Sequence, residues 1–243
     1  MGKYNIITFD LLDSTNTYAL QNIDALEDRT LILANSQTKG RGKFQRGWES
    51  QNTKNIYASL VLKPKNNLDS KFFFGNITQF LSVIICDILK QYGVLPEIKW
   101  PNDILISDKK ICGILTEKST KNAGVVVGFG INLELKKEEA EKISRKATSL
   151  SAELKAKKDI NKISFLNLLL DAFFMEYDSF LLNGFDFFKE RYIKYSNFLG
   201  KEILINNFDT SIKGIAKSIN DDGTLTIENE NKKEIKIIAG EIA

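Results

Sequence analysis

The alternation of apolar and polar positions predicts that the chain begins with a strand and a helix. Residues 3–10 (KYNIITFD) are rich in β-branched and aromatic side chains, which is typical of a strand. Asp13 and Ser14 are N-cap candidates, and they predict a helix from there to about Leu26. A second apolar run at 30–36 is typical of a buried strand, and the polar, glycine-bearing segment after it is predicted to be a loop.

The middle of the chain predicts one long helix followed by a series of short strands. Apolar residues recur with helical spacing between Ser70 and Tyr92, and Gly93 is a suitable C-cap. The short β-branched runs beyond this helix are separated by turn residues, which predicts a meandering, largely antiparallel sheet. The predicted strands cover 55–64 before the helix and 97–100, 104–107, 110–117 and 123–135 after it.

The last third predicts helices that cover the sheet and then a separate small β domain. Residues 136–147 form at most a short polar helix, while 161–195 carry two helices split near Asn183, with Phe and Leu on their inner faces. Several short strands separated by turns then predict a small barrel. The expected fold class is α+β, with a mixed, mostly antiparallel sheet covered by helices in 1–196 and the barrel in 197–243.

Composition and charge are those of an ordinary globular protein. Of the 243 residues, 43% are hydrophobic and 27% are charged. Neither a run of about 18 apolar residues nor a basic start before an apolar stretch occurs, so we expect a cytoplasmic protein without a membrane span or a secretory signal. The net charge of +3 is too small to indicate nucleic-acid binding. Cys86 and Cys112 have no CxxC partner, which favours reduced, structural thiols.

The chain has no histidine, and this restricts its chemistry more than any other feature. Ser-His-Asp and Cys-His nucleophiles and the usual histidine-containing zinc sites are excluded. Carboxylates, lysines, backbone amides and oxygen-bound Mg²⁺ are still available. Any catalysis must therefore be electrostatic and positional.

The predicted loop at 39–48 (KGRGKFQRGW) has the composition of an anion-binding segment. Backbone amides freed by glycines stand among four cations, and both kinds of group bind phosphate or carboxylate oxygens. A solvated basic loop explains this composition equally well. Trp48 favours a ligand, because a large aromatic at the end of a polar loop can cover an adenine, although it could also be plain core. The cations are Lys39, Arg41, Lys43 and Arg46.

The segment KWPND (99–103) presents two polar side chains at a turn between strands. A simple turn uses such residues often, whereas a functional interpretation has Asp103 facing Mg²⁺ or an incoming amine, with Asn102 beside it. A two-residue hairpin at 108–109 would bring Lys110 beside Asp103 on one sheet edge. A lysine at a hairpin is most often a solvated surface charge.

Glycines inside two predicted strands cost stability unless something packs against the bare backbone. Gly113 follows Lys110 by three positions, and GFGIN (128–132) contains two more glycines. A bulge or a strand crossing accounts for them as well. Near the start of the chain, DSTN (13–16) is by itself no more than a helix cap.

Taken together, these motifs resemble a bacterial biotin protein ligase over nearly the whole chain. They are DSTN, Gln37 with KGRGKFQRGW, KWPNDILISDKKICGILTE, VVVGFGIN and the small terminal domain, in this order and at these intervals. The resemblance implies a class II synthetase-like catalytic domain followed by an SH3-like barrel. It further implies an enzyme that joins biotin and ATP to biotinyl-5′-AMP, and then transfers the biotinyl group to a lysine of a biotin carboxyl carrier protein.

The same resemblance implies roles for individual residues. Lys110 ranks first, because an ammonium fixed between the biotin carboxylate and the α-phosphate would stabilise charge in the transition state; Asp103 and Arg41 complete the catalytic set. Biotin contacts are implied for Ser14, Thr15, Asn16, Gln37, Gly40, Arg41, Gly42, Lys110, Gly113, Gly128 and Gly130. Adenylate contacts are implied for Arg41, Gly42, Lys43, Trp48, Asn102, Asp103, Lys110 and Asn132.

Further expectations concern partners and departures from the family pattern. The resemblance implies ATP and biotin as substrates, Mg²⁺ held through phosphates with Asp103 as a candidate contact, and a homodimer through an exposed sheet edge near 125–130. The chain begins almost directly at the catalytic domain, so operator binding is not expected. Lys43 stands where Arg is more frequent, and Gln45 where Gly is frequent, which predicts a looser hold on the adenylate and an altered loop shape.

Two other functions stay open. A lipoate ligase shares the fold and the acyl-adenylate chemistry but has a different glycine-rich signature. A non-catalytic biotin sensor would keep the pocket residues and lose Lys110 or the GRG loop, both of which are present.

Overall fold

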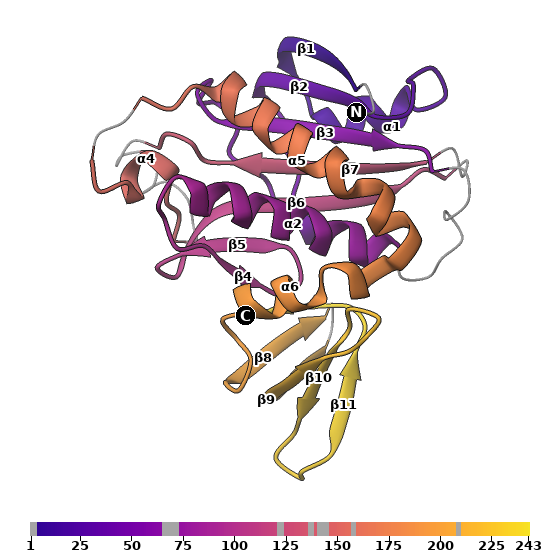
Figure 1. Ribbon diagram of the computed structural model, residues 1–243, viewed down its shortest axis with the longest axis vertical. Helices are drawn as coiled ribbons and strands as arrows, with labels where there is room; N and C mark the ends of the chain where they lie inside the picture. Colours follow the sequence, from indigo (N-terminus) through magenta and orange to yellow (C-terminus); the bar gives the residue numbers. More distant parts are fainter. Residues whose placement is uncertain are drawn as a thin grey trace.

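The chain forms a large sheet flanked by helices and a smaller sheet made of its last residues (Figure 1). The structure is a computed structural model. It describes residues 4–64, 73–120, 124–135, 139, 146–156, 159–207 and 210–243. Within these residues, no helix is both long and apolar enough to cross a membrane.

The large sheet has seven strands in the order β1-β2-β3-β7-β6-β5-β4. Its first pair, β1 and β2, is parallel, and the other neighbouring pairs are antiparallel. This confirms the predicted mixed, mostly antiparallel sheet. The strands are β1 (Asn5–Leu12), β2 (Thr30–Gln37), β3 (Ile56–Leu62), β4 (Glu97–Lys99), β5 (Asp103–Ile106), β6 (Lys109–Lys118) and β7 (Val125–Ile131).

Strand β7 lies inside the sheet, which corrects one expectation. It pairs with β3 on one side and β6 on the other, and all of its residues are buried. The exposed edge expected near 125–130 is therefore wrong. An unbroken run of valine, glycine and phenylalanine is typical of a strand covered on both faces, and the described edges of this sheet are β1 and β4.

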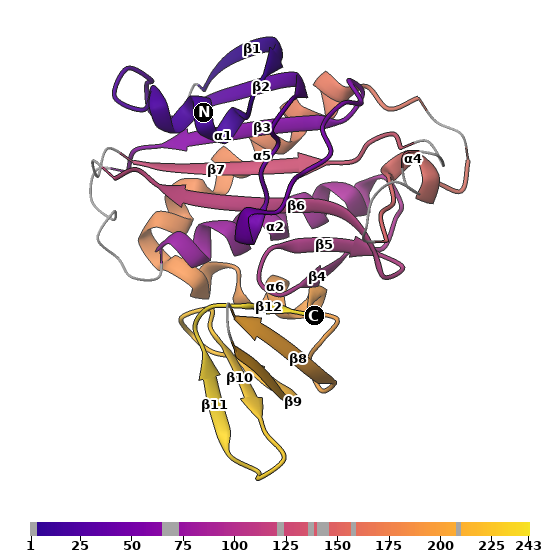
Figure 2. The ribbon, with the colours of Figure 1, turned by 180° about the vertical axis from the view of Figure 1, so that it is seen from behind.

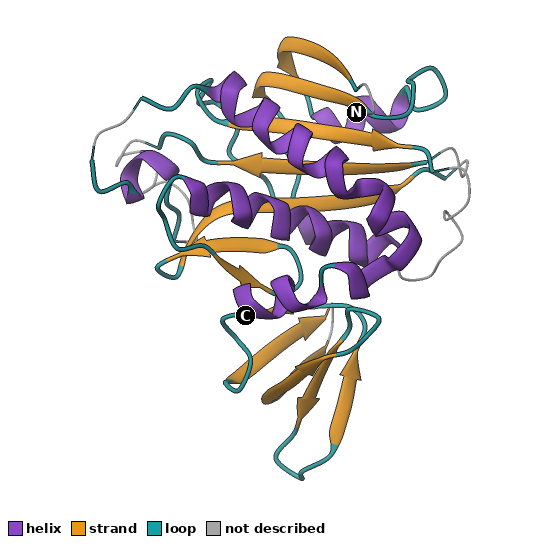
Figure 3. Ribbon diagram, viewed as in Figure 1, coloured by secondary structure: helices purple, strands orange, loops and turns teal. Residues whose placement is uncertain are grey.

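Helices α2 (Phe73–Gln91) and α5 (Lys162–Asn183) cover one face of the sheet (Figures 1 and 3). Their aromatic side chains pack together, and the rings of Phe80 and Phe180 stack with centroids 4.8 Å apart. Helix α1 (Thr15–Gln21) lies on the opposite face, which Figure 2 shows. The remaining helical segments are η1 (Lys43–Gln45), α4 (Leu150–Glu153), η2 (Gly184–Phe187) and α6 (Lys189–Tyr195).

Several boundaries differ from the prediction for local reasons. Helix α1 ends before Leu26: its C-cap is Asn22, where the backbone leaves the helical conformation and the side-chain amide donates to the carbonyl of Tyr18. The β5–β6 turn lies one residue earlier than expected, at Ser107 and Asp108, whose φ angles of 51° and 60° are those of a tight hairpin turn.

Other expectations of the sequence are met, are met in part or lie outside the described residues. The split near Asn183 is confirmed, since α5 ends there and η2 follows. Gly93 has a φ of 88° just beyond α2. The strand expected at 123–135 ends at Ile131. The short helix expected at 136–147 falls largely outside the described residues.

The last part of the chain forms a separate antiparallel sheet in the order β11-β10-β9-β8-β12. Among the contacts that attach it to the large sheet and its helices, Ile242 N donates to the carbonyl of Trp100 at 3.4 Å, and Gln79 Nε2 donates to that of Gly223 at 2.8 Å. These contacts bring β12 toward the β4–β5 end of the large sheet. The strands are β8 (Glu202–Asn207), β9 (Thr210–Ile219), β10 (Leu225–Glu228), β11 (Glu234–Ile237) and β12 (Glu241–Ile242).

Candidate active site

A cavity of about 390 Å³ gathers residues from α1, the loop at 39–48 and strands β2, β3, β5, β6, β7 and β12. This volume is within the range of small-molecule sites. With the exception of Gly40, each site residue implied by the sequence lines it. These residues are Ser14, Thr15, Asn16, Gln37, Arg41, Gly42, Lys43, Trp48, Asn102, Asp103, Lys110, Gly113, Gly128, Gly130 and Asn132.

Gly40 supports the loop from behind the cavity lining. A Cβ at this position would lie 2.4 Å from the carbonyl oxygen of Trp48 and 2.5 Å from Ser50 Oγ. The Gly40 carbonyl accepts a hydrogen bond from Trp48 N at 2.9 Å. Gly40 is therefore needed for the close approach of the two loop strands, and the structure does not bring it to the cavity surface.

One end of the cavity, which we call the polar end, is lined by Ser14, Thr15, Asn16 and Gln37, with Ser59 buried behind them. Ser14 is the N-cap of α1, and the two residues after it are buried against β3. Gln37 Oε1 accepts hydrogen bonds from Thr15 N at 2.8 Å and from Thr15 Oγ1 at 3.2 Å. Ser59 Oγ lies within hydrogen-bond distance of Thr15 Oγ1 and Asn16 Oδ1. The polar end is thus a preset network of neutral, buried groups.

Gly128 makes room for this network. A Cβ added there would lie 2.0 Å from Asn16 Oδ1, so any larger residue in β7 would displace the amide. The sequence pattern indicated close approach at this glycine, and the group that approaches is a side chain of α1.

The opposite end, which we call the charged end, is built around Lys110. Its Nζ lies 2.7 Å from Asp103 Oδ1, which confirms that the β5–β6 hairpin brings the two together. The backbone of Lys110 is fixed as well, because its N–H donates to the carbonyl of Lys146 and its carbonyl accepts from Thr148 N, each at 2.9 Å. Asp103 is 9% exposed.

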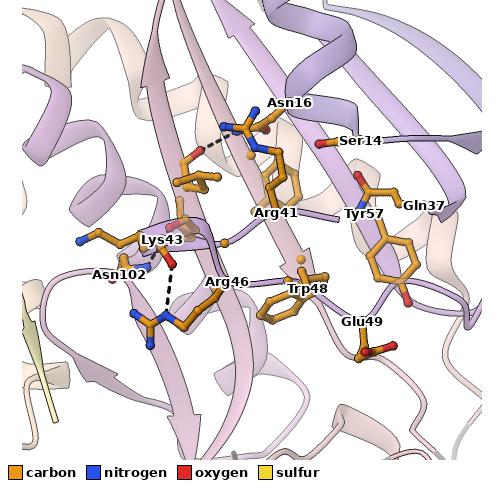
Figure 4. Close-up of a pocket in the computed structure, with 18 of the residues that line it drawn as sticks. Ser14, Asn16, Gln37, Arg41, Lys43, Arg46, Trp48, Glu49, Tyr57 and Asn102 are labelled. Carbon is orange, nitrogen blue, oxygen red and sulfur yellow. Dashed lines mark hydrogen bonds between the residues drawn. The ribbon is translucent and has the colours of Figure 1, made fainter. Parts of the chain in front are cut away.

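Trp48 is half-buried and lines the cavity (Figure 4). A Cβ at Gly130 would lie 2.4 Å from its indole ring, and one at Gly113 would lie 2.9 Å from it. Only glycines at these positions therefore let the ring pack directly against the backbone of the sheet. The Lys110 ammonium lies 5.2 Å from the ring centroid. In the described part of the chain, the buried Nε1 of Trp48 has no hydrogen-bond partner. Trp48 thus belongs to the cavity and is not plain core.

The loop at 39–48 folds back on itself and rests on the second sheet. Gly42 N donates to the carbonyl of Arg46 at 2.7 Å. Lys43 Nζ donates to the carbonyl of Gly240 at 3.4 Å, and Arg46 forms an ion pair with Glu241. Burial lowers the pKa of the Lys43 ammonium below its usual value, although Asp103 and Glu241 act in the other direction.

Asn102 and Asn132 brace the walls of the charged end. Asn102 Nδ2 donates to the carbonyl of Ile114 at 2.9 Å, and Asn132 Nδ2 donates to that of Thr148 at 3.0 Å. Both side chains are buried. Their amide nitrogens hold neighbouring segments in position, and this ties β5 to β6 and β7 to the segment before α4.

Among the residues at or beside the site that the sequence interpretation missed, three make polar contacts with its implied residues or its loop. Glu117 of β6 contacts Asn16 and Arg41, and strand alternation from Gly113 could have pointed to it. Ser59 of β3 could not be told from an ordinary strand residue. Glu241 reaches the cavity from the second sheet, and no local pattern indicates a contact with the loop some 195 positions earlier in the chain.

Buried thiols and metal ligands add little to this site. Cys86 and Cys112 are free and buried, as predicted, and burial raises the pKa of both thiols. Among the residues that the structure describes, no three Cys, Asp or Glu side chains are grouped so as to hold a metal ion.

Comparison with known proteins agrees with this geometry. The sequence profile of the Biotin/lipoate A/B protein ligase family matches residues 8–132, which include every implied site residue. The chain belongs to this family. Within the family, it is 33% identical over 243 residues to the bifunctional ligase/repressor BirA of Bacillus subtilis, covering 97% of this chain and 73% of BirA. It is 26% identical to the biotin-[acetyl-CoA-carboxylase] ligase of Paracoccus denitrificans, covering 92% of this chain and 94% of that one.

A solved structure of the same family has a similar fold over nearly all of the chain. It is the biotin protein ligase from Aquifex aeolicus in complex with biotin and ATP, with a TM-score of 0.83 and 27% identity. The superposition covers 98% of this chain and 97% of that one. The likeness therefore includes both the large sheet and the second sheet.

Proposed function

We propose that this chain is a biotin protein ligase, which activates biotin with ATP to biotinyl-5′-AMP and transfers the biotinyl group to a lysine of a biotin carboxyl carrier protein. The observation that carries the proposal is the joining of a polar end and a charged end in one cavity. This suits two ligands that must meet, one with a neutral ureido head and one with a polyphosphate. The similarity to a ligase solved with biotin and ATP supports the same reaction.

At the polar end, the buried hydrogen-bonding groups bind the biotin head. A site built from hydrogen bonds discriminates strongly against ligands that lack the matching polar atoms, because its own groups are then left unpaired. Ser14, Thr15, Asn16 and Gln37 supply these groups, with the glycines at 113, 128 and 130 along the sheet. Lipoate has no ureido group, so it satisfies them poorly.

At the charged end, Lys110 acts in the first step. A biotin carboxylate oxygen forms a bond to the α-phosphorus, the bond from this phosphorus to the β-phosphate oxygen breaks, and pyrophosphate leaves. No protein nucleophile is needed, so the work is to bring two anions together and to neutralise charge. Lys110 does this between the anions, with Arg41, Gly42 and Lys43 on the loop side and Trp48 at the nucleotide.

In the second step, the uncharged amine of the carrier lysine attacks the acyl carbon, the bond to the phosphate oxygen breaks, and AMP leaves. Asp103, the carboxylate next to Lys110, faces the attacking amine and accepts the proton that the amine releases as the amide bond forms. Asn102 and Asn132 hold the nucleotide side of the cavity in shape.

Magnesium would reach the site with the phosphates of ATP. The described residues offer no group of three carboxylates for a protein cage, and Asp103 Oδ1 is engaged by Lys110 at 2.7 Å. Asp103 is the candidate side-chain contact. Bound Mg²⁺ would neutralise phosphate charge.

The remaining features of the proposal concern organisation. We assign 1–196 to the catalytic domain and 197–243 to a small barrel of SH3 type, a homodimer as the assembly, and the cytoplasm as the location. The carrier is a subunit of an acyl-CoA carboxylase, in line with the name of the Paracoccus relative. That the chain binds no operator DNA stays a prediction.

The test is transfer to a carrier. Purified protein is incubated with ATP, Mg²⁺ and a biotin carboxyl carrier domain, together with biotin, lipoate or neither acid, and the carrier mass is measured. The proposal predicts one added biotinyl group, which disappears when the target lysine of the carrier is replaced by arginine. Addition of lipoate instead would move the chain to the lipoate ligases, and no addition to this carrier, together with tight biotin binding, would favour a sensor.

A further inference from the structure

Two parts of the cavity share one carboxylate, that of Glu117 in β6. Its Oε2 accepts a hydrogen bond from Asn16 Nδ2 at 2.8 Å, and its Oε1 forms an ion pair with Arg41 Nη2. Asn16 belongs to α1 at the polar end, whereas Arg41 belongs to the loop at 39–48. The Glu117 side chain is 22% exposed, so this link is partly shielded from water.

Strand alternation explains why Glu117 reaches this position. Gly113, Leu115 and Glu117 are alternate residues of β6, so they face the same side of the sheet. The residue between the last two, Thr116, faces the other side, where its hydroxyl lies 2.7 Å from that of Thr78 in α2. Glu117 therefore lies on the cavity side of β6, just beyond the lining residue Leu115 and next to α1.

Glu117 fixes the orientation of the Asn16 amide. An ionised carboxylate only accepts hydrogen bonds, and so does the Leu115 carbonyl, which Asn16 Nδ2 also contacts at 3.1 Å. The amide nitrogen must face these two acceptors, and Oδ1 must face the Ser59 hydroxyl. A flipped amide would set its oxygen against two acceptors, which is costly in a buried site.

The same carboxylate also orients the side chain of Arg41. One guanidinium nitrogen, Nη2, pairs with Glu117, and the other, Nη1, donates to Thr17 Oγ1 at 3.2 Å. This two-pronged contact directs the arginine toward the first turn of α1. An exposed ion pair alone contributes little to stability, but this one is joined to a buried amide of the polar end.

We propose that Glu117 is a positioning residue that couples binding at the polar end of the cavity to the position of Arg41 in the loop. The inference rests on the proposed function, because the ligand at the polar end is taken to be the biotin head. Removing the carboxylate releases both partners at once. Biotin then loses a preset amide, and the loop loses the contact that holds it over the bound ligand.

The test compares Glu117→Gln with Glu202→Gln in biotin-dependent ATP–pyrophosphate exchange. A glutamine at 117 must turn its NH₂ toward one of its two donor partners, so one contact is lost while the shape is kept. We expect the KM for biotin to rise at least about tenfold, with kcat at saturating biotin within about threefold of the unmodified chain. Biotin should also no longer slow tryptic cleavage in the loop.

Glu202 is a suitable control because it pairs with Lys213 on the surface of the second sheet, at 2.9 Å. Its variant should leave both kinetic constants unchanged. A purely structural role of Glu117 would lower the active fraction, and hence kcat, without changing the KM for biotin. If Glu117→Gln does not fold, Glu117→Asp keeps the charge on a shorter side chain and should still raise this KM at least about threefold.

An unchanged KM for biotin in a folded variant at 117, with normal exchange in the unmodified chain, would overturn the inference alone. If the unmodified chain shows no biotin-dependent exchange, the proposed function fails, and the coupling that rests on it fails too. The two failures are thus told apart by the unmodified protein.

Discussion

The two ends of the cavity differ in the forces they use. The polar end consists of neutral, buried groups whose hydrogen bonds are already made, such as that from Thr15 N to Gln37 Oε1. The charged end consists of ions, such as Lys110 and Asp103, that are paired with one another. Directional hydrogen bonds select a ligand by its polar pattern, whereas charges neutralise and activate it. The cavity thus separates recognition from activation.

The supports of the two ends differ as well. The polar end rests on α1 and on strands in the middle of the large sheet. The charged end depends on a loop, with Lys43 and Arg46 attached to Gly240 and Glu241 of the second sheet. We therefore expect the polar end to be preset and the charged end to be completed when ligands bind.

The largest expected effect comes from removing the central charge. Lys110→Ala should lower the rate of adenylate formation at least about a hundredfold, because a contact made in the transition state is lost. Biotin should still bind, with an affinity that falls much less than the rate does, since the polar end is untouched and only the contact with the carboxylate is lost. Single-turnover adenylation and calorimetric biotin binding measure the two quantities.

The matched control for this variant is Lys109→Ala. Lys109 is the neighbouring residue, and its Nζ lies 3.8 Å from Glu153 on the surface. The Lys109→Ala variant should form the adenylate at the same rate as the unmodified chain. Equal rates in the Lys110 and Lys109 variants would contradict the role given to Lys110.

A substitution at the polar end should have the opposite pattern of effects, with biotin affinity lowered more than the rate. In Gly128→Ala, the new Cβ would lie 2.0 Å from Asn16 Oδ1, so the amide must move. We expect biotin affinity to fall at least about tenfold, while the rate from saturated enzyme changes less. Calorimetry with biotin alone measures the affinity, and thermal unfolding checks that the variant is folded. Unchanged affinity would show that the Asn16 amide is not part of recognition.

Because the charged end depends on a loop and the polar end does not, ligands should protect this loop from proteolysis. Biotin with ATP should slow tryptic cleavage within residues 39–48 by about fivefold or more, because the loop is ordered by what it binds. Cleavage at other sites of the chain serves as the internal reference. Equal cleavage of the loop with and without ligands would mean that the charged end is as preset as the polar end.

A smaller effect is expected from pH at the charged end. Burial lowers the pKa of Lys43, so this residue loses its charge at a lower pH than an exposed lysine does. As the pH rises through that lowered pKa, the protonated form that binds phosphate disappears, and the KM for ATP should increase a few-fold. Lys43→Arg stays charged and should flatten the profile. The same alkaline rise in both proteins would assign the effect to another group.

The sequence predicted much of the site because local patterns determine it. A few neighbouring residues suffice to predict each of three features: the N-cap at Ser14, the glycines of β6 and β7, and the turn before Lys110. The pairing of Asp103 with Lys110 followed from hairpin geometry. Residues at these positions were therefore brought together as expected.

What the sequence did not predict depends on distant contacts. Strand β7 lies in the centre of the sheet, but its composition alone could not predict which strands pair with it. Glu241 meets Arg46 because the second sheet packs against the β4–β5 end, which no local pattern encodes. Glu117 is read as a surface charge until α1 is known to lie above it.

The most direct test of the separation between recognition and activation is ATP–pyrophosphate exchange, run with biotin, with lipoate and with neither acid in the presence of Mg²⁺. Exchange reports the adenylation step alone, without a carrier. The account predicts exchange that depends on biotin, with little above background for lipoate or for no acid. Exchange with lipoate but not biotin, or with neither, would contradict it.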